Sequence, residues 1–442
     1  MTNTENEVLE FIKENDVKFI RLSFCDLFGI HKNISIMSGE LQSAFEDGIS
    51  FDASAIMGFS EVNKSDLLLF PDPATLTVLP WRPGPGRVVR FYCDIKNPDK
   101  SDFIHDSRYI LKRMIKRLEA AGYVCTIGAE CEFYLFKTDE NGEPAFTPLD
   151  YGSYFDIAPL DKGEDIRREV CLCLEEMGLK PESSHHERGP GQNEIDFKFS
   201  DALSCADNLM TFKSVVKAIA SRNGLYASFM PKPILNKSGS GLHVNMSLSQ
   251  NGYNIFKIEK DQHSKIAESF IAGILSKIPE ITLFLNPLAN SYERFGKLEA
   301  PKYISWSHQN RSQLVRIPAA IGERVRMELR SPDPSANPYL AFALIVGAGL
   351  YGIENSVLLP PAVNADLYKG NEAITEKLAV LPENLEAAIV LAENSEFVKS
   401  ITGDEMLEKY IAEKKEEAAL FSKISKTEDK EALYMDKYFK YM

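Results

Sequence analysis

The chain has 442 residues, 44% of them hydrophobic and 26% charged, with a formal net charge of −14. This length exceeds one ordinary core and predicts two or three domains, and the composition is typical of a soluble globular protein. The acidic balance argues against nucleic acid or an anionic membrane as the main partner. No apolar run reaches the roughly 20 residues that span a bilayer, so we expect no membrane segment.

The first residues, MTNTENEVLEFIKEN, are polar and acidic, which predicts neither a signal peptide nor a transit peptide. The seven cysteines form no C-x-x-C pair and no even framework. Such usage is typical of reduced thiols, so we expect a cytoplasmic protein.

From Val17 to about Pro98 the sequence favours β-strands. VKFIRLSFCDLFGIHKNISI contains two alternating runs joined at Gly29, which predicts a hairpin, and GRVVRFYCDI predicts a further strand. Segment 106–121 begins with an Asp cap, has apolar residues at helical spacing and ends in Gly, which predicts a helix. We therefore expect one domain at 1–105 and a second at 106–442.

In the second domain, strands and helices alternate. We expect strands at 125–136, 241–250 and 324–334, helices at 163–179, 202–224 and about 261–277, a loop at 286–312, and then helices to the end. The most apolar segment, 339–353, is short and interrupted by glycine, which predicts a buried helix.

Four of the predicted strands carry polar side chains on one face and apolar ones on the other, because faces alternate with period two. On the second of these strands, NEIDFKF, Phe199 is expected to share the apolar face of Ile195 and Phe197. For a single strand, a solvent-exposed outer face is the simplest interpretation. The polar positions of the four strands are Glu130 and Glu132; Glu194 and Asp196; His243, Asn245 and Ser247; and Arg326, Glu328 and Arg330.

If the four faces line one cavity, these carboxylates and Glu187 repel one another unless cations lie among them. Oxygen ligands with one imidazole suit Mg²⁺ or Mn²⁺ better than Zn²⁺, and arginines suit carboxylate or phosphate. This combination is what phosphoryl transfer from a nucleotide requires. No Walker or dinucleotide-binding sequence is present, and SGSG at 238–241 alone is weak. His185 and His186 are expected to be polar neighbours rather than ligands.

With these motifs the chain resembles the bacterial type I family of glutamine synthetases over nearly its whole length. The motifs occur in the family's order: IRLSFCDLFGIHKN, FDASAIMGF, GAECEFYLF, GPGQNEIDF, GSGLHVNMS, NRSQLVRIP and RMELRSPDPSANPYL. The resemblance implies an α+β fold: a small N-terminal β-grasp domain and a larger α/β catalytic domain, whose curved antiparallel sheet lines the active site. It also implies a dodecamer of two hexameric rings, with sites between neighbouring subunits.

The resemblance also implies roles for single residues. Two or three Mg²⁺ or Mn²⁺ ions would be held by two sets, namely Glu132, Glu187 and Glu194, and Glu130, His243 and Glu328. Glutamate and the transferred phosphoryl group would be bound by Gly239, His243, Arg294, Arg311 and Arg330. ATP would be contacted by Phe199, Asn245, Ser247, Arg316 and Arg326. Glu299 would be the flap glutamate that closes the site, and Asp52 would bind and deprotonate ammonium in the site of the next subunit.

The implied reaction is ATP-dependent synthesis of glutamine from glutamate and ammonium through γ-glutamyl phosphate, with Arg311, Arg330, Asp52 and Glu299 as catalytic residues. Four departures from the family pattern leave alternatives open: FDASA has alanines at 53 and 55, Ser238 replaces the usual Asn, the flap is one residue shorter, and Glu61 replaces an arginine of feedback-inhibited members. One alternative is a γ-glutamyl ligase that uses a small amine or polyamine. The other is a non-catalytic scaffold or nitrogen sensor. Tyr368 matches the adenylylated tyrosine of other members only weakly, and a surface role is the simpler interpretation.

Overall fold

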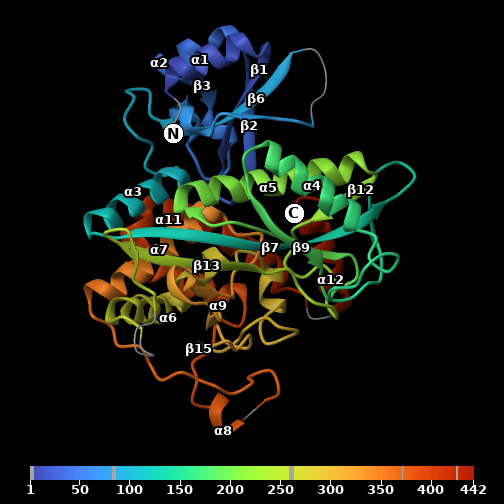
Figure 1. Cartoon of the computed structure of the whole chain (residues 1–442), viewed down its shortest axis with the longest axis vertical. Coiled ribbons are helices and arrows are strands. Elements are labelled where there is room, and N and C mark those ends of the chain that lie inside the picture. The colour runs from blue at the N-terminus through green and yellow to red at the C-terminus, as the bar shows by residue number, and fades with distance from the viewer. Residues whose placement is uncertain (1–3, 82–85, 258–262, 371, 425–426) are drawn as a thin grey trace.

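The computed structural model describes residues 4–81, 86–257, 263–370, 372–424 and 427–442 (Figure 1). Within these residues a six-stranded sheet forms near the N-terminus, with β2, β1, β6, β4 and β3 in spatial order and β5 beside β6. Helices α1 (Glu5–Glu14) and α2 (Leu41–Glu46) pack with it. The strands are β1 (Val17–Cys25), β2 (His31–Met37), β3 (Ile49–Asp52), β4 (Asp66–Pro71), β5 (Thr77–Val78) and β6 (Arg87–Lys96).

The predicted hairpin is confirmed, since β1 and β2 pair antiparallel on either side of Gly29, whose φ is +85°. That angle favours glycine. The strand β6 pairs parallel to β1, which buries Ile20, Leu22, Val89 and Phe91 in a core of their own.

The larger sheet contains eleven strands within the described residues, with β15, β16, β17, β13, β7, β10 and β9 in spatial order. Its centre is the long strand β7 (Val124–Thr138), flanked by β13 (Leu242–Gln250) and β10 (Gln192–Phe197). The other strands are β8 (Pro144–Pro148), β9 (Pro181–His186), β11 (Ser200–Asp201), β12 (Leu225–Ser228), β14 (Tyr253–Asn254), β15 (Trp306–His308), β16 (Val315–Ile317) and β17 (Met327–Leu329).

Helices cover this sheet, and in Figure 1 α5 lies between it and the N-terminal sheet. The helix expected at 106–121 is α3 (Ser107–Ala120), capped by Asp106 as predicted, and the apolar segment is the buried helix α7 (Pro338–Glu354). The remaining helices are α4 (Glu164–Glu176), α5 (Ala202–Arg222), α6 (Lys265–Leu285), α8 (Glu372–Thr375), α9 (Leu385–Glu393), α10 (Glu396–Thr402), α11 (Asp404–Phe421) and α12 (Thr427–Tyr434). Among the described helices, none is long and apolar enough to cross a membrane.

Three sequence expectations were wrong in extent. Helix α6 begins at Lys265, capped by Ser264, and continues to Leu285 because its apolar face continues past Pro279; positions 261 and 262 of the expected range lie outside the described residues. The strand expected at 324–334 is reduced to β17, since Gly322–Arg324 forms a 3₁₀ turn. Phe199 does not share the buried face of Phe197, because β10 ends at Phe197 and Phe199 is 71% exposed.

Candidate active site

The four strands with a polar face are neighbours in one sheet. Their order is β17, β13, β7, β10, and every adjacent pair is antiparallel. Residues directly opposite one another in such pairs have side chains on the same face. The opposed pairs are Glu194 and Glu132, Asp196 and Glu130, His243 and Glu130, and Asn245 and Glu328. One continuous polar face is the result.

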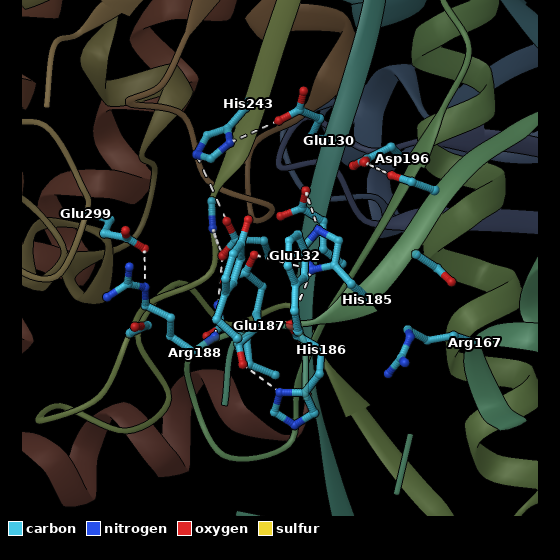
Figure 2. Close-up of a pocket in the computed structure, with 18 of the residues that line it drawn as sticks. Glu130, Glu132, Arg167, His185, His186, Glu187, Arg188, Asp196, His243 and Glu299 are labelled. Carbon is cyan, nitrogen blue, oxygen red and sulfur yellow. Dashed lines mark hydrogen bonds and ion pairs between the residues drawn. The ribbon is translucent and has the colours of Figure 1, made fainter. Parts of the chain in front are cut away.

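This face forms the floor of a cavity of about 1240 Å³ (Figure 2). Most of the residues proposed from the sequence line it: Glu130, Glu132, Glu187, Glu194, Gly239, His243, Arg294, Glu299, Arg311, Arg316, Arg326 and Arg330. Five do not belong to the described lining: Asp52, Phe199, Asn245, Ser247 and Glu328.

Glu130, His243 and Glu328 form one compact group, with a donor atom from each within 4.8 Å of the others. The Nδ1 atom of His243 lies 3.3 Å from a Glu130 oxygen and 3.6 Å from a Glu328 oxygen, and Figure 2 shows the ring of His243 facing Glu130. Burial is the largest single effect and favours the neutral form of Glu130, but the hydrogen bonds with His243 and Asn245 and the charge of His243 together lower the pKa of Glu130.

Glu328 is 1% exposed and already carries two guanidinium partners. Arg316 Nη1 donates to one of its oxygens at 2.6 Å, and Arg330 Nη1 donates to the other. Burial alone would raise the pKa of Glu328, but Arg330, His243 and Arg316 lower it to about 2. This carboxylate is therefore ionised and fixed by the chain itself.

A second group consists of His185, Glu187 and Glu194, again with donor atoms within 4.8 Å of one another. His185 lies 3.6 Å from each of the two carboxylates. Glu132, expected beside Glu187 and Glu194, is on the neighbouring strand, and its Oε2 accepts hydrogen bonds from Gln192 Nε2 at 2.7 Å and from the Gly241 N–H at 3.0 Å. His185 therefore belongs to a group of residues that could hold a metal ion, whereas the sequence interpretation expected it to be a polar neighbour.

The carboxylates in this second half of the cavity lie close together and repel one another. Burial, with Glu187 as the next cause, raises the pKa of Glu132 to about 7, and burial likewise raises that of Glu187 to about 7. Burial and then Asp196 raise the pKa of Glu194 well above its ordinary value, and burial with Glu130 raises that of Asp196 to about 6. Crowded carboxylates with imidazoles fit a hard divalent cation, because a bound cation removes their mutual repulsion.

The Gly-Pro-Gly turn brings Glu187 toward β10. Glu187 N–H donates to the Gln192 carbonyl at 2.8 Å, closing the turn. A Cβ at Gly189 would lie 2.0 Å from the Tyr134 hydroxyl, so only glycine fits there. His186 points away from the carboxylates (Figure 2), with Nε2 2.8 Å from Asp150, as expected of a polar neighbour.

The flap residue Glu299 reaches the cavity from the opposite wall. Its φ is +76°, an unfavourable value for a non-glycine residue, and two contacts hold it there. Arg188 Nε lies 3.1 Å from its carboxylate (Figure 2), and the Tyr368 hydroxyl lies 2.6 Å from its backbone oxygen and 2.9 Å from that of Arg311. Tyr368, interpreted from sequence as a surface residue, is 39% exposed but contacts the flap.

The loop before β13 packs tightly on Arg294. A Cβ at Gly239 would lie 2.6 Å from the Pro231 oxygen and 2.7 Å from Arg294 Cγ, so a side chain there would displace the arginine. Arg294 is 3% exposed and donates to the Ser331 oxygen at 3.0 Å. Its Nε has no partner among the described residues.

Three of the residues proposed to contact ATP lie on β13 or beside it, namely Asn245, Ser247 and Phe199. Asn245 donates to Glu130 at 2.7 Å and accepts from Arg326 Nε at 2.8 Å. Ser247 Oγ is 2.9 Å from Thr126 Oγ1, and Phe199 lies over Gly128, the residue opposite Asn245.

Asp52 lies in the N-terminal sheet, at the exposed end of β3. Ser54 donates to its Oδ1 through both the hydroxyl, at 2.6 Å, and the backbone N–H, at 3.0 Å. These bonds lower the pKa of Asp52 and keep it ionised.

His185, Arg188 and Tyr368 are the residues near the site that the sequence interpretation missed. The first had a usable signal: Ser183, His185 and Glu187 alternate, so His185 shares the face of Glu187 if the segment is a strand. Arg188 and Tyr368 carried no such signal, because both act from loops.

Comparisons with known proteins find similarity over nearly the whole chain. The model of the glutamine synthetase β-grasp domain matches residues 16–98, and that of the glutamine synthetase catalytic domain matches residues 104–432. A glutamine synthetase from Clostridium saccharobutylicum is 47% identical over 93% of this chain and 94% of its own length. One from Methanosarcina mazei is 46% identical over 94% of each.

Two solved structures also match nearly the whole chain. One described as a GmaS/ADP complex superimposes with a TM-score of 0.88 at 29% identity, over 98% of this chain and 99% of its own. A GmaS without ligand gives 0.86 at 30%, over 99% and 100%. The chain belongs to the glutamine synthetase family.

Proposed function

We propose that the chain is an ATP-dependent glutamate–ammonia ligase, which forms glutamine through γ-glutamyl phosphate. The observation that carries this proposal is the single polar face of β17, β13, β7 and β10, where carboxylates and arginines line one cavity of about 1240 Å³. The relatives from Clostridium saccharobutylicum and Methanosarcina mazei, which match over nearly their whole length, carry the name glutamine synthetase.

Divalent metals, Mg²⁺ or Mn²⁺, would be held by two sets of ligands. Glu130, His243 and Glu328 would hold one ion, and Glu132, Glu187 and Glu194 would hold another, with His185 3.6 Å from the carboxylates of the last two. Bound there, the metals neutralise phosphate charge and stabilise the charge that develops during transfer.

The arginines bind the substrates. Arg294, Arg311 and Arg330 are proposed to hold glutamate, beside Gly239, and the transferred phosphoryl group. Arg316 and Arg326 lie toward Asn245, Ser247 and Phe199, where we place ATP. Guanidinium groups fixed in a buried site stabilise phosphate charge without reorganising during the reaction.

An acyl phosphate must be kept from water before ammonia attacks it. Glu299 is placed to close the cavity, held by Arg188 and Tyr368 at the distances given above. Closing loops of this kind both exclude water and complete the catalytic group.

Asp52 is exposed and does not belong to the described lining of its own chain's cavity. We propose that it reaches the cavity of a neighbouring subunit, where its ionised carboxylate binds ammonium and takes its proton. This requires an oligomer with sites between subunits, for which we propose a dodecamer of two hexameric rings. A row of exposed apolar residues beside the cavity supports such an interface: Tyr154, Phe155, Ile157 and Leu160.

Mixed oligomers test this arrangement. Asp52→Ala and Glu328→Ala alone should each abolish glutamine synthesis. Co-expressed, they should recover about a quarter of wild-type activity, because random assembly leaves that share of shared sites with both residues intact. Native mass spectrometry confirms that the oligomers are mixed. Mixed oligomers without activity would contradict a shared site.

Asp52→Ala by itself should reduce turnover with ammonium far more than ATP binding, measured by calorimetry. Equal loss of both would mean that Asp52 is structural. The altered FDASA segment favours a second candidate function, transfer of glutamate to a small amine or polyamine, and a panel of amines distinguishes the two.

We also propose a reducing compartment, the cytoplasm. All seven cysteines lie in the described residues and are free, and six of them are buried.

A further inference from the structure

Asp150 is a buried carboxylate on the side of the Gly-Pro-Gly turn that faces away from the active-site cavity. It is 3% exposed and does not belong to the described lining of that cavity. Its Oδ1 accepts hydrogen bonds from the backbone N–H groups of Gly152, at 3.2 Å, and Gly191, at 2.9 Å, and its Oδ2 accepts from that of Lys162, at 2.9 Å. Gly191 is the last residue of the turn. One carboxylate therefore joins the turn to two points of the loop between β8 and α4.

His186 connects the same carboxylate to Glu187. Its side chain is buried, and its ring lies between two oxygens. Nε2 is 2.8 Å from Asp150 Oδ1, and Nδ1 is 2.5 Å from the backbone oxygen of Glu187 (Figure 2). Asp150 thus holds the turn at both ends, through His186 before it and through Gly191 after it.

A second pair of charges holds β10 beside the turn. Arg167 on α4 places its Nη2 2.5 Å from Asp161 Oδ2, and its Nη1 donates to Asn193 Oδ1 at 2.6 Å. Asn193 Nδ2 in turn donates to the Gly191 oxygen at 2.9 Å. Because Asn193 precedes Glu194, this chain of hydrogen bonds fixes the strand at the residue next to a proposed metal ligand.

Asp150, Asp161 and His186 bring donor atoms within 4.8 Å of one another, a spacing that could hold a metal ion. Each carboxylate already has a partner, however, since Arg167 pairs with Asp161 and the His186 ring faces Asp150. Burial alone would raise the pKa of Asp150, but the hydrogen bonds from His186 and from the backbone lower it to about 2. This cluster is therefore stable without a cation, unlike the crowded carboxylates in the cavity.

We propose that Asp150 is a positioning residue for the metal ion at Glu187 and Glu194, an inference that rests on the proposed function. The two ionised glutamates repel one another, and the turn between them contains two glycines, which restrict the backbone little. Asp150 anchors the turn through His186 and Gly191. Both carboxylates therefore face one ion site before the ion arrives, as buried groups behind metal ligands commonly ensure.

Titration with Mn²⁺ in the absence of ATP tests this inference, by calorimetry and by the electron paramagnetic resonance of free Mn²⁺. Glu187→Gln identifies the class of bound ions that depends on this carboxylate, because the variant should lose that class. Asp150→Asn keeps the size of the side chain but removes its charge and one acceptor. It should weaken Mn²⁺ binding to the same class about 10–100-fold and leave the class at Glu130, His243 and Glu328 unchanged.

Asp94→Asn is the matched control. It makes the same change in a partly buried carboxylate of the N-terminal sheet, which pairs with Arg108 and Lys112, both at 2.7 Å. The control should lower the thermal midpoint but leave both classes of Mn²⁺ unchanged. Equal loss of Mn²⁺ affinity in Asp94→Asn and Asp150→Asn would show that Asp150 is merely structural.

A second variant keeps the test valid if Asp150→Asn does not fold. In Gly152→Ala the new Cβ would lie 2.9 Å from His186 Nε2, so the ring must shift away from Asp150 without any change of charge. This variant should weaken the same class of Mn²⁺ by a smaller factor.

Three outcomes would overturn the inference, and they are distinguishable. Unchanged affinity of that class in whichever of the two variants folds would mean that the turn needs no anchor. Loss of a further class of ions in Asp150→Asn would mean that the cluster is itself a metal site. A wild type without any class that Glu187→Gln removes would contradict the metal sites of the proposed function, and the inference would fall with them.

Discussion

The two halves of the main cavity hold their carboxylates in opposite electrostatic states. In the paired half, Glu328 lies between Arg316 and Arg330, and its pKa falls to about 2. In the unpaired half, no arginine of the described residues lies within 4.0 Å of the Glu132 or Glu187 carboxylate, and burial raises their pKa values to about 7.

This difference shows which part of the site is complete without a ligand. The paired half is neutralised by the chain's own arginines, so its geometry is fixed before any substrate arrives. In the unpaired half, the ionised carboxylates repel one another, and either protonation or an added cation relieves that repulsion. We therefore expect substitutions in the two halves to affect stability with opposite signs, although both remove proposed metal ligands.

Glu328→Gln should have the largest effect. It leaves Arg316 and Arg330 buried without their shared carboxylate, which costs about 3–5 kcal/mol and lowers the thermal midpoint by about 5–10 °C. Metal-dependent ATP use should fall by about 10³-fold or more. Calorimetry and a phosphate-release assay measure the two effects.

Glu140→Gln is the matched control for that variant, because Glu140 is exposed in the turn between β7 and β8. It should leave stability and activity unchanged. A Glu328→Gln protein as stable as the control would mean that the paired half is not held by its ion pairs.

Glu187→Gln should stabilise the metal-free protein. The folded-state pKa of Glu187 is about 7, above its ordinary value of 4.5, so the wild type loses stability as the pH rises between these two values, and the amide does not. The gain should be near zero at about pH 4 and reach about 1–3 kcal/mol above about pH 7. Thermal unfolding with chelator across this range measures it, and destabilisation at pH 8 would contradict the comparison.

Metal binding should depend on pH through the same half. Because Glu132 and Glu187 are partly protonated below about pH 7, a metal must displace their protons, and its apparent affinity should rise from about pH 6 to about pH 8 and then level off. Calorimetric titration of Mn²⁺ in two buffers of different ionisation enthalpy counts the protons released. Release of none at pH 6.5 would argue that these carboxylates are not ligands.

Arg316→Gln should have the smallest effect on stability. Glu328 keeps Arg330 and His243, so its pKa should rise only partly from about 2, and the activity that remains should keep the wild-type pH profile between about pH 5 and pH 8. Steady-state rates measure the profile, and thermal unfolding measures the stability. Destabilisation as large as that of Glu328→Gln would show that Arg330 and His243 do not hold Glu328 without Arg316.

The sequence predicted which residues share a face, because strand periodicity is local. It could not predict that β13 lies between β7 and β17, since that order depends on contacts between distant segments. The family resemblance supplied the location of the site instead. The position of His185 beside Glu194 could not be predicted, because their register is fixed only by the pairing of β9 with β10.

Other differences have equally local causes. Phe199 follows the end of β10, where alternation no longer decides which side chain is buried. Tyr368 and Arg188 act on the flap from loops whose path no periodic pattern encodes. The partner of Asp52 lies outside the chain altogether in our proposal, so neither the sequence nor one subunit reveals it.

A panel of nitrogen acceptors tests the central claim most directly. Purified protein is incubated with ATP, glutamate and Mg²⁺, and phosphate and γ-glutamyl product are measured with ammonium, methylamine or a polyamine. We predict glutamate-dependent phosphate release that is fastest with ammonium and yields glutamine. Faster turnover with methylamine or a polyamine would contradict ammonia as the acceptor, and no ammonium-dependent phosphate release would contradict catalysis itself.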